Sequence, residues 1–339
     1  MPDYTKFDGA WFVFYRQSTG EYKRLAKRDA PRWEQLKAYA DFTEGGSVKF
    51  RDCINAYLSS NKFKSLAKGT QNKYLVAVAT KGDPEKGISG NQELMYSFGD
   101  MEPSGIRPPD IRLFMDSWEH MPSKANNMHT ALSAIIKWNI QRGYIVGTNP
   151  CQGVEKYPDK GSGRYVTDKE YKAFFDFLVE NKKEMHAYAM AIAYLCGSRL
   201  QDVLRLTRHR AFNWKDDDCY KTEKGLIIYQ MKTGKVQLKK WSDELKSIVD
   251  MALSSHSDFY IITKQGGGQY TPDGFKSTWQ RMQIKAFEAG VLTQRFRFHD
   301  MKKKAASDVD ADRRALFLGS TESTANRYNE TADAVDPVR

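Results

Sequence analysis

The chain has 339 residues, and its 53 lysines and arginines against 42 acidic residues give a formal net charge of +11. A domain typically holds about 100–200 residues, so this length predicts two or three domains. Hydrophobic residues make up 40% of the chain and charged residues 28%, which excludes wholesale disorder. The positive charge fits a polyanionic partner such as nucleic acid, and it fits equally well a protein that only needs to stay in solution.

The sequence favours a soluble, cytoplasmic protein with no membrane partner. No stretch approaches the roughly 18 consecutive apolar residues that a membrane helix needs. The N-terminus lacks the apolar segment and cleavage site of a secretory signal. The four cysteines, of which Cys196 follows an apolar run, form no CxxC pair and no Cys–His cluster. They therefore predict neither a metal site nor a disulfide framework.

Residues 1–46 predict a small β-rich module. Aromatic and β-branched residues flank a Ser-Thr-Gly turn signal at 18–20, which is typical of a β-hairpin. Pro31 then marks the start of a helix, because proline is favoured in the first turn. The pair Gly45-Gly46 predicts a hinge after this helix.

Residues 47–157 predict a helical domain. Apolar residues recur at spacings of three and four over 48–60 and 69–82, and a further helix follows the pair Pro108-Pro109. The clearest amphipathic pattern runs over 124–143 and ends at Gly143. The Pro-, Gly-, Ser- and Lys-rich segment 158–163 predicts a linker.

Residues 164–339 predict a second large unit of mixed α and β structure. Thr167 and Glu170 have the spacing of a capping box, which predicts that a helix starts there. The mostly apolar run 186–197 predicts a buried helix. Two strands flank a Thr-Gly turn at 233–234, and helices are expected over 275–290 and after His299.

Several residues of this second unit could act on a phosphate. Arg199 follows a Gly-Ser break, and its guanidinium could give a phosphate two parallel hydrogen bonds while Asp202 orients it. Lys232 at the tip of the hairpin could give a proton to a leaving oxygen. Each also has an ordinary interpretation, as a solvated helix face or as a polar turn.

Two further segments add a possible nucleophile and its cations. His299 and Lys302 are three residues apart, hence on one helix face, and both could point at one oxyanion. The sequence Leu318-Gly319 precedes Tyr328, whose hydroxyl could attack phosphorus if cations stabilise its anion. Taken singly, these segments are as well explained by a basic helix on a DNA backbone and by a surface tyrosine.

In this order, the segments resemble the catalytic domain of the tyrosine recombinases, the phage integrase family. The motifs are CGSR at 196–199, KTG at 232–234, HDMK at 299–302, and LGS at 318–320 followed by Tyr328. Residues 142–157 look like the end of the family's core-binding domain, so the resemblance covers roughly 47–331. It implies a mainly α protein with small β-sheets. A helical, SAM-like core-binding domain would precede a mixed α+β catalytic domain at 164–339, and residues 1–46 look like an arm-binding module.

The resemblance implies site-specific DNA recombination without metal, cofactor or ATP. Tyr328 would form a 3′-phosphotyrosyl intermediate, Arg199 and Lys302 would bind phosphate oxygens, His299 would bind one or assist proton transfer, Lys232 would protonate the leaving oxygen, and Asp202 would orient Arg199. Lys302 stands where the family has a second arginine. Ser320 stands where it has His or Trp if the loop to Tyr328 is one residue short; otherwise Gly319 does.

The implied partners are double-stranded DNA at attachment sites, three further copies of the chain in a tetrameric synapse, and possible DNA-bending accessory proteins, in the cytoplasm or nucleoid of the host cell. Basic and amide side chains near the motifs are the expected DNA contacts: Arg205, Arg208, Arg210, Lys235, Lys239, Lys240, Arg295, Arg297, Lys303, Lys124, Asn126 and Asn127. Two alternatives stay open, a topoisomerase-like relaxing enzyme and a non-catalytic DNA-binding regulator.

Overall fold

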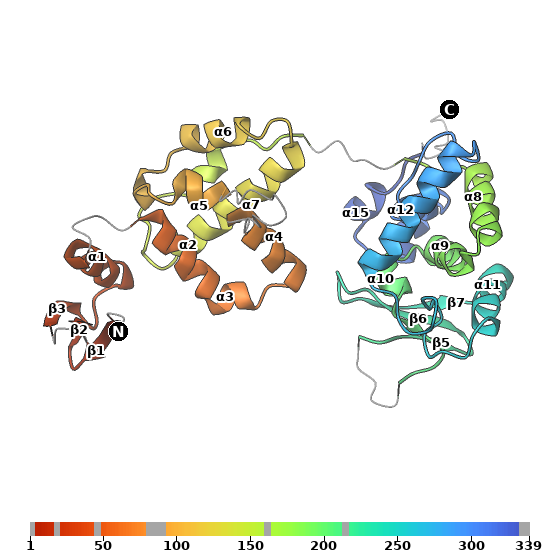
Figure 1. Cartoon of the computed structure of the whole chain (residues 1–339), viewed down its shortest axis with the longest axis horizontal. Coiled ribbons are helices and arrows are strands. Elements are labelled where there is room, and N and C mark those ends of the chain that lie inside the picture. Colours follow the sequence, from red (N-terminus) through yellow and green to blue (C-terminus); the bar gives the residue numbers. More distant parts are fainter. Residues whose placement is uncertain are drawn as a thin grey trace. The chain divides into compact units, whose positions relative to one another are not determined.

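The computed structural model describes residues 4–16, 21–43, 49–78, 93–158, 164–211 and 217–331. The chain divides into two compact units, Met1–Lys160 and Gly161–Arg339, which are taken separately below (Figure 1). The turn expected at 18–20, the hinge at Gly45-Gly46 and residues 159–163 of the expected linker lie outside the described residues. A separate module at 1–46 therefore stays a prediction.

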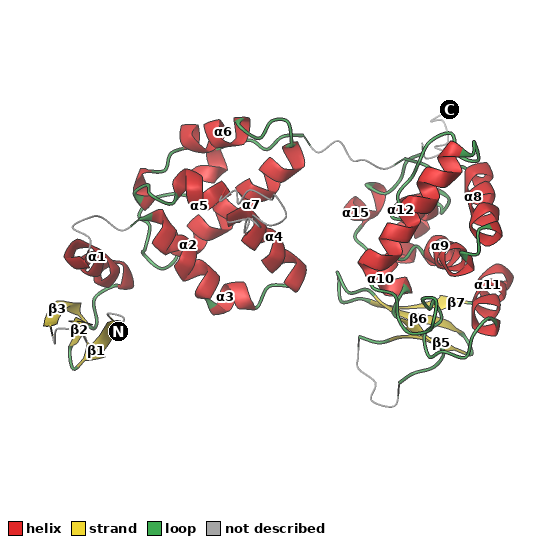
Figure 2. Cartoon of the chain, in the orientation of Figure 1, coloured by secondary structure: helices red, strands yellow, loops and turns green. Residues whose placement is uncertain are grey.

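The chain begins with a three-stranded antiparallel sheet of order β1-β2-β3, built from β1 (Tyr4–Asp8), β2 (Trp11–Arg16) and β3 (Glu21–Lys27) (Figure 2). The pairing of β2 with β3 confirms the predicted hairpin, and β1 is an additional strand. Helix α1 (Arg32–Thr43) starts directly after Pro31, as predicted. The buried Gln35 side chain joins this helix to the sheet by donating to the carbonyls of Lys27 and Arg28 at 3.3 and 3.0 Å.

Helices make up the rest of the first unit: α2 (Phe50–Ser59), α3 (Asn61–Lys64), α4 (Lys68–Val78), α5 (Glu93–Phe98), η2 (Pro103–Gly105), α6 (Pro108–Asp116), α7 (Pro122–Ile140) and η3 (Pro150–Gly153). Helix α7 runs through their shared core, and Leu132, Ile135 and Ile136 on its buried face are at most 1% exposed. Asn139 on the same face donates to the carbonyl of Cys53 at 3.1 Å, which ties α7 to α2.

The second unit surrounds a buried helix, α9 (Glu184–Cys196), which confirms the expectation from its apolar sequence. The other helices of this unit are α8 (Asp168–Glu180), α10 (Leu200–Val203), α11 (Asp243–Ser254), α12 (Pro272–Glu288), α13 (Asp300–Ser307), α14 (Ala311–Leu318) and α15 (Glu322–Asn326). Helix α9 contacts α8, α10, α11 and α13. The capping box is present, since the Thr167 hydroxyl accepts from Glu170 N at 3.3 Å and the Glu170 carboxylate accepts from Thr167 N at 3.0 Å.

A four-stranded sheet of order β4-β5-β6-β7 completes the second unit, with β4 (Leu206–Thr207), β5 (Cys219–Thr222), β6 (Gly225–Tyr229) and β7 (Val236–Lys240). The antiparallel pairing of β6 with β7 confirms the hairpin expected around the Thr-Gly turn. The protein is thus mainly helical with two small sheets, as predicted. Within the described ranges, no helix has the length and apolarity needed to cross a bilayer.

Candidate active site

Arg199 is fixed at a sharp break between two helices. Helix α9 ends at Cys196, and Gly197 follows it in the left-handed conformation, with a φ of +58°. A side chain at Gly197 would strain this backbone, and its Cβ would lie 2.7 Å from the Phe317 ring. Arg199 then occupies the N-cap position of α10, and its guanidinium donates to Gln230 Oε1 at 3.3 Å.

Lys232 is exposed on the turn between β6 and β7. The turn closes where the Gln230 carbonyl accepts from Thr233 N at 3.0 Å and from Gly234 N at 2.8 Å. Asp202, 1% exposed, supports it by accepting from Met231 N at 3.2 Å. The hydrogen bond to Arg199 comes from Gln230, while Asp202 and Arg199 attract each other by charge, so the orienting role of Asp202 stays a prediction.

Tyr328 lies against the two predicted residues of the HDMK motif. His299 precedes α13, and its ring centroid lies 5.6 Å from that of Tyr328, edge to face. Lys302, on the first turn of α13, has its ammonium 5.5 Å from the centroid of the same ring. Tyr328 itself is half-buried, just beyond α15.

The cations of the site shift one another's pKa values. Burial, followed by repulsion from Arg199, Lys239 and Lys232, lowers the pKa of Lys302 to about 7. Desolvation by the surrounding protein, followed by repulsion from Lys302 and Arg199, lowers the pKa of His299 to about 4. His299 is exposed, and the cations beside it disfavour its protonated form. These charge interactions show that four of the predicted residues lie near one another: Arg199, Lys232, His299 and Lys302.

Lys302 has unusual surroundings for a lysine, because it is only 1% exposed. Among the described residues it forms no salt bridge, and the charge of Asp202 only partly offsets the repulsion from the neighbouring cations. A buried, unpaired ammonium costs folding free energy, so this arrangement is typical of a site awaiting an anion. Ser320, the sixth predicted residue, has a buried hydroxyl with no hydrogen-bond partner among the described residues, so no such bond joins it to the other five.

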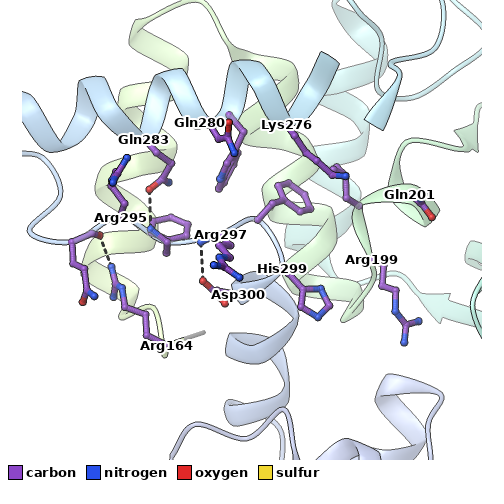
Figure 3. A pocket seen from close by; sticks show the side chains of 15 residues that line it. Arg164, Arg199, Gln201, Lys276, Gln280, Gln283, Arg295, Arg297, His299 and Asp300 are labelled. Atoms are coloured by element: carbon purple, nitrogen blue, oxygen red, sulfur yellow. Dashed lines mark hydrogen bonds between the residues drawn. The ribbon is translucent and has the colours of Figure 1, made fainter. Parts of the chain in front are cut away.

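A cavity of about 730 Å³ opens beside this group (Figure 3). Arg199 and His299 lie toward one end of it and Arg164 and Arg295 toward the other. The loop before α13 is held in shape by two hydrogen bonds, from Arg297 N to Asp300 at 2.7 Å and from Phe296 N to Gln283 at 3.0 Å. The exposed Arg295 and Arg297 side chains therefore line a fixed, basic cavity next to the predicted reacting groups.

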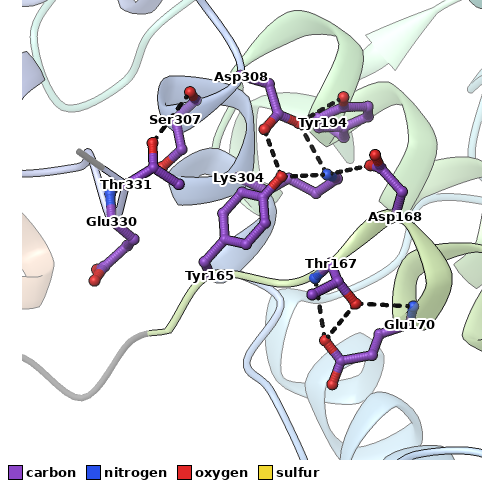
Figure 4. A network of polar contacts seen from close by, with 10 residues as sticks. All are labelled: Tyr165, Thr167, Asp168, Glu170, Tyr194, Lys304, Ser307, Asp308, Glu330 and Thr331. Atoms are coloured by element: carbon purple, nitrogen blue, oxygen red, sulfur yellow. Dashed lines mark hydrogen bonds and ion pairs between the residues drawn. The ribbon is translucent and has the colours of Figure 1, made fainter. Parts of the chain in front are cut away.

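Helix α13 is anchored on its far side by the buried Lys304 (Figure 4). The Lys304 ammonium contacts Asp168 at 2.5 Å and Asp308 at 2.8 Å, and it donates to the Tyr165 hydroxyl at 3.3 Å. The Tyr194 hydroxyl donates to Asp308 at 2.8 Å. This network joins α13 to the start of α8 and to α9, and so fixes the helix that carries Lys302.

Several expected DNA contacts of the second unit are instead engaged within the protein. Arg208 donates to the carbonyls of Asp258 at 2.5 Å and Leu253 at 2.8 Å. Arg205 pairs with Asp217 at 3.1 Å, and Lys303 pairs with Glu330. Lys239 turns inward and donates to the Phe317 carbonyl, and burial lowers its pKa to about 8. The Arg208 and Lys239 side chains both donate to carbonyls of their own chain, and their contact with DNA stays a prediction.

In the helical domain, too, two of the expected DNA contacts bind groups of their own chain. The Lys124 ammonium lies 2.7 Å from the buried Glu93 carboxylate and 3.9 Å from the centroid of the Trp118 ring. Asn126 exchanges hydrogen bonds with the backbone of Tyr157, at 2.8 and 3.0 Å. Asn127 is exposed. The expected contacts that are exposed at the surface are Arg210, Lys235, Lys240, Arg295, Arg297 and Asn127.

Gln230 was not predicted, although it contacts two parts of the site. Its side chain is 4% exposed, accepts from Arg199, and donates to the Leu318 carbonyl at 2.9 Å. No sequence signal distinguishes it from any other polar residue at the end of a strand. Its partners are 31 and 88 residues away in the chain, so no local pattern contains them.

Comparison with solved structures identifies the fold. The chain is similar to the lambda integrase dimer bound to a COC′ core site, at a TM-score of 0.66 and 16% identity, over 99% of this chain and 97% of that one. It is also similar to the lambda integrase tetramer bound to a Holliday junction, at 0.65 and 15%, over 97% and 95%. The Tn1549 transposon integrase in complex with circular intermediate DNA matches at 0.62 and 13%, over 84% and 96%.

The protein therefore has the tyrosine-recombinase fold, as the order of its motifs predicted. The particular structures that show it are integrases of lambda and of the transposon Tn1549. No family model matches the sequence, and no curated protein does.

Proposed function

We propose that this protein is a site-specific DNA recombinase that cuts and rejoins DNA through Tyr328. The observation that carries the proposal is the contact of Tyr328 with His299 and with Lys302, a buried lysine without an ion-pair partner among the described residues. The fold supports it, because the integrases that share this fold were solved as DNA complexes.

In the proposed reaction the Tyr328 oxygen attacks a DNA phosphorus. The new O–P bond gives a 3′-phosphotyrosyl link, and the bond from phosphorus to the 5′ oxygen breaks. His299, which is neutral near pH 7 because its pKa is about 4, accepts the phenolic proton. Lys232 on the exposed turn gives a proton to the leaving 5′ oxygen. A 5′-hydroxyl of a partner duplex then reverses the step and completes strand exchange.

Arg199 and Lys302 stabilise the charge that gathers on the phosphate in the transition state. A lysine cannot give a phosphate the two parallel hydrogen bonds of an arginine. The Lys302 ammonium is, however, held in a buried position, where a charge interaction is strong. Removing one such donor typically costs on the order of 10²–10³ in rate. A bound phosphate also raises the pKa of Lys302, because an opposite charge favours its protonated form.

The duplex is held by the exposed cations around this site. Arg295 and Arg297 line the cavity beside His299, and Lys235 and Lys240 flank the hairpin. Such side chains bind phosphates and position the DNA without reading its sequence, so binding weakens steeply with salt. In this proposal the helices of 47–157 contact the DNA as well, residues 1–46 bind a separate arm site, and four copies form the synapse.

The proposal is tested with a nicked duplex that releases a short strand after cleavage and so traps the covalent intermediate. Wild-type protein is expected to form an adduct that survives denaturation, and Tyr328→Phe is expected to form none. Tyr96→Phe serves as the matched control, because Tyr96 is 83% exposed and lies in the other unit. DNA binding without any adduct would overturn the proposal in favour of a regulator. Relaxation of supercoils without exchange between duplexes would favour a topoisomerase-like enzyme.

A further inference from the structure

The hairpin that carries Lys232 is tied to the end of α14 by three side chains. Gln237 donates to the Leu316 carbonyl at 2.7 Å, Lys239 donates to the Phe317 carbonyl, and Gln230 donates to the Leu318 carbonyl at 2.9 Å. The last four carbonyls of a helix have no partner within the helix. Three successive carbonyls at the end of α14 therefore receive donors from the β6–β7 hairpin.

Of the three side chains, Gln230 forms the most hydrogen bonds. Besides the Leu318 carbonyl, its amide nitrogen donates to Gln237 Oε1 at 2.9 Å. Its amide oxygen accepts from the Arg199 guanidinium at 3.3 Å and from the Thr233 hydroxyl at 3.0 Å. A glutamine amide has two donor hydrogens and two acceptor lone pairs, so all four positions are filled.

The backbone of the Leu-Gly sequence is shaped to receive this amide. Gly319 ends α14 in the left-handed conformation, with a φ of +60°. A Cβ at Gly319 would lie 2.5 Å from Gln230 Nε2 and 2.8 Å from Gln237 Oε1, closer than atoms can pack. Only glycine allows the hairpin amides to lie directly against this turn.

We propose that Gln230 is a positioning residue that holds the Arg199 guanidinium and the Lys232 turn at a fixed place relative to the segment leading to Tyr328. This inference rests on the proposed function of the same site. Gln230 touches no reacting atom itself; it acts through Arg199 on one bond and through Thr233, the neighbour of Lys232, on another. Displacement of reacting groups by about 1 Å costs on the order of 10²-fold in rate, so a residue of this kind controls the reaction.

The test compares two suicide substrates, one with the natural 5′ oxygen at the scissile bond and one with sulfur in its place. A sulfur leaving group departs as a stable thiolate and needs no proton, so it reports whether the leaving-group acid is in place. Gln230→Leu is expected to slow adduct formation about 100-fold with oxygen and about 10-fold with sulfur. The ratio of the sulfur rate to the oxygen rate then rises about tenfold above the wild-type ratio.

Thr233→Val is the second variant, because Thr233 is exposed and the change removes one hydrogen bond to Gln230 without emptying the core. It is expected to slow the oxygen substrate about tenfold and to leave the sulfur substrate near the wild-type rate. Gln269→Leu is the control, because Gln269 donates to a backbone carbonyl in the same unit without touching Gln230. Its rate ratio is expected to equal that of wild type.

A wild-type rate ratio in either Gln230→Leu or Thr233→Val would overturn the positioning role, because a merely structural defect slows both substrates equally. If Gln230→Leu does not fold, Thr233→Val decides the question alone. Wild-type protein that forms no adduct with either substrate contradicts the proposed function itself, which separates the two failures.

Discussion

Lys302 is the residue on which the proposed chemistry depends most. Its ammonium is buried among Arg199, Lys232 and Lys239, and Asp202 is the acid that opposes their repulsion. With a pKa of about 7, a large share of Lys302 is neutral in the DNA-free protein near pH 7. The proposed role needs the cation, since only the charged form stabilises the transition state. Activity should therefore depend on pH through this group.

Lys302→Arg tests this dependence. In wild type, kcat/KM for adduct formation is expected to fall as the pH rises above about 7, because this constant reports pKa values of the free protein. Arginine stays protonated over this whole range, so the falling limb should disappear in the variant. A pH profile of single-turnover cleavage gives the measurement, with the exposed Lys235→Arg as control. A falling limb at the same pH in Lys302→Arg would rule out Lys302 as its source.

His186 carries a prediction about stability. It is 1% exposed and stacks on the Phe275 ring with centroids 4.1 Å apart. Burial lowers its pKa to about 4, and a backbone hydrogen bond with Phe275, which raises the pKa of the imidazole, does not outweigh burial. Between about pH 6.5 and pH 4, His186 is therefore protonated in the unfolded chain but neutral in the folded protein. The contribution of neutral His186 to stability is present above pH 6.5 and is lost as the pH falls toward 4.

His186→Phe is expected to unfold at nearly the wild-type urea concentration at pH 7 but to lose less stability in acid. At pH 4 the difference approaches about 3 kcal/mol, from a pKa shift of roughly two and a half units at 1.36 kcal/mol each. Urea unfolding at pH 7, 5.5 and 4.5 measures it, and the other titrating groups act equally on both proteins. Parallel losses in the two proteins would show that His186 does not resist protonation.

At the scale of elements, the sequence predicted the helices and strands that a local sequence pattern marks. The capping box of α8, the apolar run of α9 and the strands around the Thr-Gly turn were all found. Helix α11 was not predicted, although Ser242 caps it and acidic residues fill its first turn. The hydrogen bonds from the β6–β7 hairpin to the carbonyls that end α14, here called the clamp, could not be predicted. They join residues about 80 positions apart, and no spacing in the sequence encodes them.

Gly319→Ala tests the clamp through the backbone. Alanine in the left-handed conformation costs about 1–2 kcal/mol, and the clash with the amides of Gln230 and Gln237 adds to this. Gly290→Ala is the matched control, because Gly290 follows α12 with a φ of +72° and a Cβ there meets nothing within 4 Å. We expect thermal unfolding to shift further in Gly319→Ala, and only that variant to lose most of its cleavage. Equal effects of the two substitutions would show that the close approach is unimportant.

At the scale of the whole molecule, the two units have separate cores. The core of Gly161–Arg339 is built around α9, and that of Met1–Lys160 around α7. The order of four weak motifs and Tyr328 along the chain predicted the tyrosine-recombinase fold, which the structure comparison confirmed. The individual DNA contacts stay predictions. What the sequence did not reveal is which of these cations bind a carbonyl or a carboxylate of their own chain, as Arg208 and Arg205 do.

A fragment of residues 161–339 is expected to fold by itself. Calorimetry should give one cooperative transition, since this unit buries its own apolar core. The fragment should still form the covalent adduct, because every predicted catalytic residue lies within it, but should bind DNA more weakly and with a smaller salt dependence. Aggregation of the fragment, or unfolding without a cooperative transition, would contradict the independence of the two units.

The most direct test of the central claim is to identify the residue that becomes linked to DNA. The trapped adduct is digested with protease and nuclease, and tandem mass spectrometry locates the modified peptide. The account predicts a 3′-phosphonucleotide on Tyr328 together with a free 5′-hydroxyl on the released strand. A nucleotide on any other side chain, or a 5′-phosphate linkage, would contradict it.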